Sequence, residues 1–129
     1  MPEPLAYLNG RFVRSAECVL PMYDAGIVLG AAVTDLLRTY RGQPYAADRH
    51  IQRFFESAKY AYLPLPVSRA ELRDIVDRLI RHNLAIWSGR ELALILYATA
   101  GELSIYAGSA VACAPGIAPR VRQALNLNS

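Results

Sequence analysis

Apolar residues recur along the chain with two different spacings, and these spacings predict where its helices and strands lie. Two stretches place apolar residues three or four positions apart, as on one face of a helix. The first covers about residues 49–62, with Asp48 as its expected N-cap, and the second follows the capping box Ser68–Glu71 and continues to near Asn83. The pattern therefore predicts two consecutive amphipathic helices.

Strands are predicted by alternation and by turn residues. The Asn9-Gly10 pair between apolar runs indicates a tight hairpin over residues 7–13, and Arg41-Gly42 indicates a second one. Between them, residues 33–40 alternate. One face of this strand would carry Thr34, Leu36 and Arg38, and the other Val33, Asp35, Leu37 and Thr39. Further strands are expected at 91–99 and 110–114, and a short helix beginning within 122–127.

This order of elements predicts an α+β fold, with an antiparallel or mixed sheet of hairpins and two main helices packed on one side. We expect one domain over residues 1–114. The Pro-Gly and Ala-Pro pairs after residue 114 indicate a linker-like tail over 115–129, leading toward a further domain.

Composition is typical of a folded chain, with 53% hydrophobic and 19% charged residues among 129. No apolar run approaches the roughly 18 residues that a membrane span needs, and the first residues do not resemble a secretory signal. Cys18 and Cys113 lie far apart without metal-ligand spacing, so we expect a cytoplasmic protein without disulfides or a metal site.

The net charge of +3 does not by itself indicate a nucleic-acid partner. Thirteen of the fourteen basic residues are arginines, but they are scattered and interleaved with acids, as in the run from Arg69 to Asp74. This pattern is typical of solvated helix faces, and no nucleic-acid-binding motif is present. We therefore expect neither a nucleic acid nor a membrane as partner.

Arg53 is the leading candidate for a binding residue. It would lie early in the first helix, where a guanidinium can offer paired donors to a phosphate. The alternative is a surface arginine paired with Glu56 three residues further on. The residues alone leave both interpretations open.

Four motifs in sequence resemble one known family. They are LNG…V, D-x-G, R-x-Y-x-G-x-P-Y and H-x-x-R-F-x-x-S-A, and they extend from Tyr7 into the first helix. This combination resembles the class IV (fold-type IV) aminotransferases, which use pyridoxal 5′-phosphate (PLP). The group includes branched-chain and D-amino-acid aminotransferases and aminodeoxychorismate lyases.

The resemblance implies functions for particular residues. Arg53 would contact the PLP phosphate, and Thr34, Leu36 and Arg38 would line the pocket for an amino-acid or keto-acid substrate. Arg38 is the natural partner for a substrate carboxylate, and His50 would be structural. The resemblance also implies a homodimer.

Two departures from the family pattern limit what can be transferred. Thr34 stands where many members have an aromatic residue, and Asp35 where they have a glutamate, so the substrate is not implied. The family's Schiff-base lysine lies in a second domain, beyond residue 129. The chain's only lysine, Lys59, matches a lysine that is not catalytic.

We therefore expect a truncated or domain-length aminotransferase-like chain, with no catalytic residue of its own and no activity alone. The whole protein would transfer an amino group between an amino acid and a 2-keto acid. One alternative is an aminodeoxychorismate-lyase-like enzyme. Another is a non-catalytic assembly module that pairs with a separate C-terminal half.

Overall fold

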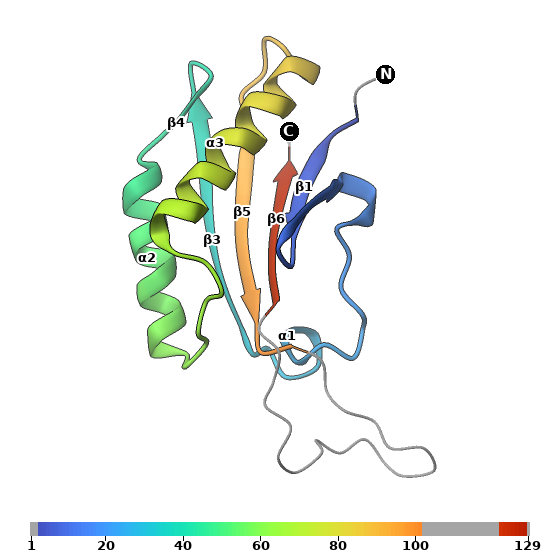
Figure 1. The fold of residues 1–129 in the computed structure, drawn as a ribbon, viewed down its shortest axis with the longest axis vertical. Helices are drawn as coiled ribbons and strands as arrows, with labels where there is room; N and C mark the ends of the chain where they lie inside the picture. The colour runs from blue at the N-terminus through green and yellow to red at the C-terminus, as the bar shows by residue number, and fades with distance from the viewer. Residues whose placement is uncertain (1–2, 102–121, 129) are drawn as a thin grey trace.

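A six-stranded antiparallel sheet forms the centre of the molecule, with strand order β2-β1-β6-β5-β3-β4. The computed structural model describes residues 3–101 and 122–128. The two long helices α2 and α3 lie against one face of the sheet (Figure 1). The strands are β1 (Leu5–Leu8), β2 (Arg11–Arg14), β3 (Ala32–Tyr40), β4 (Gln43–Pro44), β5 (Ala93–Thr99) and β6 (Arg122–Asn128). The predicted α+β fold is confirmed.

Both predicted hairpins are present. Asn9 and Gly10 have φ of 51° and 93° and join β1 to β2, while Arg41 and Gly42, with φ of 52° and 74°, join β3 to β4. Two consecutive positive φ values are what a type I′ turn needs. Glu91 fastens the second turn, because its carboxylate accepts hydrogen bonds from the amides of Arg41 (2.7 Å) and Gly42 (3.0 Å).

The helices are α2 (Ala47–Tyr60) and α3 (Arg69–Ile86). Ser68 is the N-cap of α3 as predicted, with its hydroxyl accepting from the Glu71 amide at 3.1 Å. The expected Asp48 cap of α2 is wrong. Ala46 takes the N-cap position with φ of 52°, so the helix begins earlier and Asp48 lies in its first turn. There its carboxylate accepts a hydrogen bond from Arg73 of α3 at 2.7 Å.

The core lies between the helices and the covered face of the sheet. The strands contribute Leu37, Leu94 and Leu96, and the helices contribute residues such as Phe54 and Leu79, all 1% exposed or less. The predicted alternation of β3 is confirmed. Thr34, Leu36 and Arg38 are exposed on the face that the helices leave uncovered, whereas Asp35, Leu37 and Thr39 are buried.

The helix expected within residues 122–127 is wrong, because β6 occupies this segment. It pairs with β5 over seven residues and with β1 over two. As a strand, this segment forms backbone hydrogen bonds with β1 on one side and β5 on the other. These hydrogen bonds outweigh any local preference of its residues for a helix. The strand expected at 110–114 lies outside the described residues, and the division at residue 114 stays a prediction.

Short elements connect β2 to β3 at one end of the sheet. They are a 3₁₀ turn (Ser15–Glu17) and α1 (Ala25–Val28), with Asp24 capping α1 through the amide of Gly26 at 2.8 Å. Gly26 packs against β5, where a Cβ would lie 2.6 Å from Cγ2 of Thr99. No helix among the described residues is both long and apolar enough to cross a membrane.

Candidate functional site

Two residues of α2 converge on one carboxylate of β3. Arg53 donates from Nε to Oδ2 of Asp35 at 2.7 Å and from Nη2 to Oδ1 at 2.9 Å. Nδ1 of His50 lies 2.8 Å from the same Oδ1. The tight turn after β3 causes this meeting, because it returns the chain so that the first turns of α2 pack on the covered face of β3.

The Asp35 side chain is only 2% exposed, yet its pairing with Arg53 favours the ionised form. Burial alone would raise the pKa of this carboxyl group, but the hydrogen bonds from Arg53 and His50 outweigh it and leave the pKa below its usual value. An ionised carboxylate only accepts hydrogen bonds, so Nδ1 of His50 carries the proton and donates it. The hydrogen bonds to Asp35 and its negative charge raise the pKa of Arg53.

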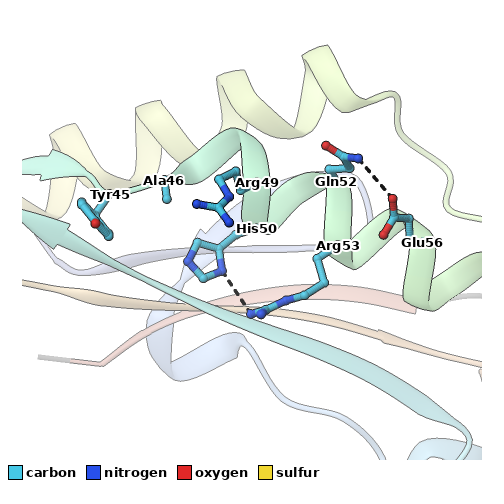
Figure 2. A pocket seen from close by; sticks show the side chains of 7 residues that line it. All are labelled: Tyr45, Ala46, Arg49, His50, Gln52, Arg53 and Glu56. Carbon is cyan, nitrogen blue, oxygen red and sulfur yellow. Dashed lines mark hydrogen bonds between the residues drawn. The ribbon is translucent and has the colours of Figure 1, made fainter.

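A pocket of about 450 Å³ lies beside this cluster. It is lined by Tyr45, Ala46, Arg49, His50, Gln52, Arg53 and Glu56 (Figure 2). Arg49 and Arg53 are four residues apart, so both lie on the same side of α2. The Arg53 side chain is 64% exposed, and among the described residues no hydrogen bond leaves its Nη1. The pocket therefore offers cationic donors to an anion.

The alternative in which Arg53 pairs with Glu56 is wrong. The Glu56 carboxylate accepts from the side-chain amide of Gln52 at 3.1 Å (Figure 2). Arg53 instead donates to Asp35. A buried carboxylate forms the stronger pair, because it is shielded from water and receives both N–H groups of one guanidinium edge.

The other predicted site residues do not join this pocket. Thr34, Leu36 and Arg38 lie on the opposite, uncovered face of β3, where Leu36 is 55% exposed and Nε of Arg38 donates to the carbonyl of Thr39 at 3.2 Å. Thr34 lies directly across from Tyr97 of β5. Burial, with a contribution from the nearby Asp24, raises the pKa of Tyr97. The predicted substrate-binding role of the three residues stays a prediction.

The sequence interpretation missed Asp35 as part of the site. The signal was present, because the alternation of β3 placed a carboxylate on the same face as Val33 and Leu37. A carboxylate at a buried position needs a cationic or hydrogen-bonding partner. Neither Arg49 nor Tyr45 carried a comparable signal, since the pocket that they line depends on the packing of α2 against β3.

Comparisons with solved structures identify the class of fold. The branched-chain amino acid aminotransferase of Escherichia coli matches 98% of this chain with a TM-score of 0.77 at 18% identity. A hypothetical aminotransferase from Mycobacterium tuberculosis, solved in a PLP-bound form, matches 96% with a TM-score of 0.68 at 18% identity. The chain covers 41% and 39% of these two proteins. At 18% identity these matches show the fold alone. It is the fold of the N-terminal region of an aminotransferase.

Sequence comparison identifies the family. The family described as amino-transferase class IV matches residues 32–123. An aminodeoxychorismate lyase of Bacillus subtilis is 32% identical over 79 residues, which are 61% of this chain and 27% of the lyase. A D-alanine aminotransferase of Bacillus licheniformis is 32% identical over 94 residues, 73% of this chain and 32% of that enzyme. The chain belongs to the class IV aminotransferase family, and it spans about a third or less of these relatives' length.

Proposed function

We propose that this chain forms the phosphate-anchoring part of a PLP-dependent class IV enzyme, with Arg53 as the anchor. The observation that carries the proposal is the fixed guanidinium of Arg53 beside a pocket that also contains Arg49. The whole protein would transfer an amino group between an amino acid and a 2-keto acid, in the cytoplasm and as a homodimer.

The donors in the pocket fit a phosphate. A phosphate monoester presents several acceptor oxygens, and Nη1 of Arg53 with the guanidinium of Arg49 can donate to them. The pocket volume lies within the usual range for small-molecule sites. PLP supplies an electron sink when bound. The role of this chain's residues is to bind and orient its phosphate end.

A second wall of the site would come from the uncovered face of β3. Thr34, Leu36 and Arg38 point away from the helices and are exposed, so they are available to a substrate. The Arg38 guanidinium suits the carboxylate that amino acids and keto acids share. We propose this role for the three residues together with the adjacent Tyr97.

Lys59 is not suited to covalent chemistry with the cofactor. It is exposed near the end of α2 and does not line the pocket beside Arg53. We therefore expect the 129-residue chain alone to show no turnover of amino acids. After borohydride reduction in the presence of PLP, mass spectrometry should find Lys59 labelled no faster than an ordinary exposed amine. Rapid labelling of Lys59 with amino-acid turnover would contradict this.

The phosphate role is tested with pyridoxamine 5′-phosphate, which lacks the reactive aldehyde, and with pyridoxamine, which lacks the phosphate. Calorimetry should show that Arg53→Met weakens binding of the phosphorylated compound about tenfold or more, since hydrogen bonds to charged groups are lost. Binding of pyridoxamine should change little.

Arg73→Met is the matched control, because Arg73 also bridges two elements through carboxylates but lies away from the pocket. An equal loss of affinity for pyridoxamine 5′-phosphate in the Arg53 and Arg73 variants would contradict the proposed phosphate-binding role of Arg53. Arg53→Lys should be intermediate, since it keeps the charge and loses the planar pair of donors.

The two alternatives each have some support. Similarity to the B. subtilis aminodeoxychorismate lyase favours a lyase, and product analysis of the whole protein separates the two reactions. An assembly module is favoured by exposed apolar side chains around α1, namely Met22, Ile27, Val28 and Leu29, which are 52–80% exposed. Its occupant would be a second domain like the remaining part of the solved relatives, and co-expression with such a domain tests it.

A further inference from the structure

We infer that Asp35 and His50 are positioning residues, which fix the guanidinium of Arg53 so that an anion meets it already oriented. The inference rests on the proposed phosphate role of Arg53 and extends it to two residues that touch Arg53 rather than the ligand. It follows from the contacts between α2 and β3.

The Asp35 carboxylate holds the guanidinium of Arg53 along one edge. Its Nε and Nη2 both donate to the Asp35 carboxylate, at 2.7 and 2.9 Å, which is the planar fork geometry. A guanidinium bound along one edge keeps one rotamer and one plane. The side chain is 64% exposed, so packing alone would leave it mobile. The carboxylate supplies the constraint that packing does not.

The carboxylate is held in turn by its strand and by His50. Asp35 lies on the nine-residue strand β3, paired with Leu96 of β5, and its side chain is 2% exposed. His50 donates to Oδ1 at 2.8 Å, which fixes the rotation of the carboxylate about its own bond. Strand, carboxylate, imidazole and guanidinium thus form one chain of contacts that ends at the pocket.

The charge of Asp35 and its orienting effect on Arg53 act on anion binding in opposite directions. A carboxylate beside an anion site repels the anion, so by charge alone Asp35 would weaken phosphate binding. Its benefit to binding must come from orientation, because an anion then loses less conformational freedom in ordering Arg53. Replacing the carboxylate by its uncharged isostere therefore sets the two effects against each other.

The orientation is measured first by NMR of the Arg53 Nε–H group, assigned by its disappearance in Arg53→Lys. A strong bond to a carboxylate should give a slowly exchanging, downfield-shifted proton signal in the wild-type chain. Asp35→Asn should move this signal to the position of a solvated arginine and speed its exchange. An unchanged signal in Asp35→Asn would overturn the inference.

Binding is then measured by titrating the same signal, or that of the Arg49 Nε–H group, with inorganic phosphate at constant ionic strength. We expect Asp35→Asn to weaken phosphate about threefold or more in spite of its lost negative charge. Asp35→Glu, which keeps a carboxylate, should restore part of the affinity. His50→Ala leaves the pair of Asp35 and Arg53 intact, so it should weaken phosphate binding less than Asp35→Asn does. It replaces Asp35→Asn as the test variant if that protein folds poorly.

Asp77→Asn is the control, since Asp77 accepts two hydrogen bonds from Nε of Arg73 at 3.2 Å on α3, away from the pocket. Equal or tighter phosphate binding by Asp35→Asn, or equal loss in the Asp77 control, would overturn the positioning role alone. A wild-type chain that shows the shifted signal but no response to phosphate would instead overturn the phosphate role on which the inference rests.

Discussion

Asp35 is a carboxylate at a buried strand position, and its contribution to stability depends on its remaining ionised. Its pKa in the folded chain is lowered by the hydrogen bonds from Arg53 and His50, which outweigh burial. A lowered folded-state pKa means that the stabilisation is fully present above the unfolded-state pKa of about 3.9. It is lost as the pH falls through the folded-state pKa.

Asp35→Asn should therefore lower the free energy of unfolding by about 1–3 kcal/mol at pH 7. The difference from the wild type should narrow as the pH falls below about 4, because the wild-type carboxyl group then becomes protonated as well. Urea unfolding at several pH values measures both effects. Asp77→Asn, in a half-exposed pair, should change stability by less than about 1 kcal/mol, and a pH-independent difference for Asp35→Asn would contradict the argument.

Sequence reasoning at the residue scale identified the donor of the site and missed its acceptor. Arg53 was distinguished by a motif that extends over several residues of α2 and β3. Asp35 was placed on the same strand face as Val33 and Leu37 and noted as a departure from the family's glutamate, but it was not assigned to the site. Its contact with Arg53 depends on how α2 turns back over β3, a relation between elements that spacing within either element does not contain.

At the scale of elements, α3 is tied to β1 through one buried side chain. The Asn83 amide accepts from the Leu5 amide and donates to the Leu5 carbonyl, both at 3.1 Å, and it also donates to the carbonyl of Leu79 at 2.8 Å. Asn83 is 0% exposed. It thus makes with β1 the pair of hydrogen bonds that a neighbouring strand would make.

Asn83→Ala should lower the free energy of unfolding by about 2–3 kcal/mol, since it leaves buried backbone groups of β1 unpaired. Hydrogen exchange should show the Leu5 amide losing more protection than amides of β5. His82→Ala is the neighbouring control, because the His82 ring makes an exposed hydrogen bond of 2.9 Å to the carbonyl of Glu3. Similar losses of unfolding free energy in the two variants would mean that the hydrogen bonds between Asn83 and Leu5 contribute little to stability.

The packing of α1 on β5 allows no side chain at residue 26. A Cβ there would lie 2.6 Å from Cγ2 of Thr99 and 2.9 Å from its Cβ. Gly26→Ala should therefore lower the melting temperature by several degrees, as overpacking costs about 1–3 kcal/mol. Adding Thr99→Ser, which removes Cγ2 but keeps the hydroxyl that accepts from the Gly101 amide, should recover part of the loss. If the two substitutions instead lowered the melting temperature additively, a clash between residue 26 and Thr99 would not be the cause of the loss.

Elements were predictable from sequence where local signals agree. The hairpins at Asn9-Gly10 and Arg41-Gly42 and the N-cap at Ser68 each depend on residues a few positions apart, and all three form. The start of α2 and the nature of residues 122–128 were not predictable. The first depends on a positive φ at Ala46, and the second on pairing with strands more than 20 residues distant.

At the scale of the whole molecule, apolar side chains gather around α1 rather than over the helix layer. Ile27 and Val28 are 54% and 52% exposed, and Met22 and Leu29 are more so. We expect the isolated chain to self-associate through this surface as its concentration rises. Replacing both Ile27 and Val28 by serine should reduce the mass measured by light scattering without lowering stability.

Tyr60→Ser is the control for this prediction. Tyr60 is 85% exposed on α2 rather than on α1, and its replacement should leave association unchanged. A monomeric wild-type chain at high concentration would contradict the role of the α1 surface. Association lost equally in both variants would show that exposed apolar residues act without a defined surface.

The position of β6 has a consequence for the order of events during synthesis. It joins the β1–β2 hairpin to the strands β5, β3 and β4, so the sheet is in two separate parts until residues 122–128 arrive. Residues 122–128 must leave the ribosome before the first hairpin can gain a strand on its open edge. Until then the nascent chain exposes two unpaired edges, at β1 and at β5, to chaperones and to other nascent chains.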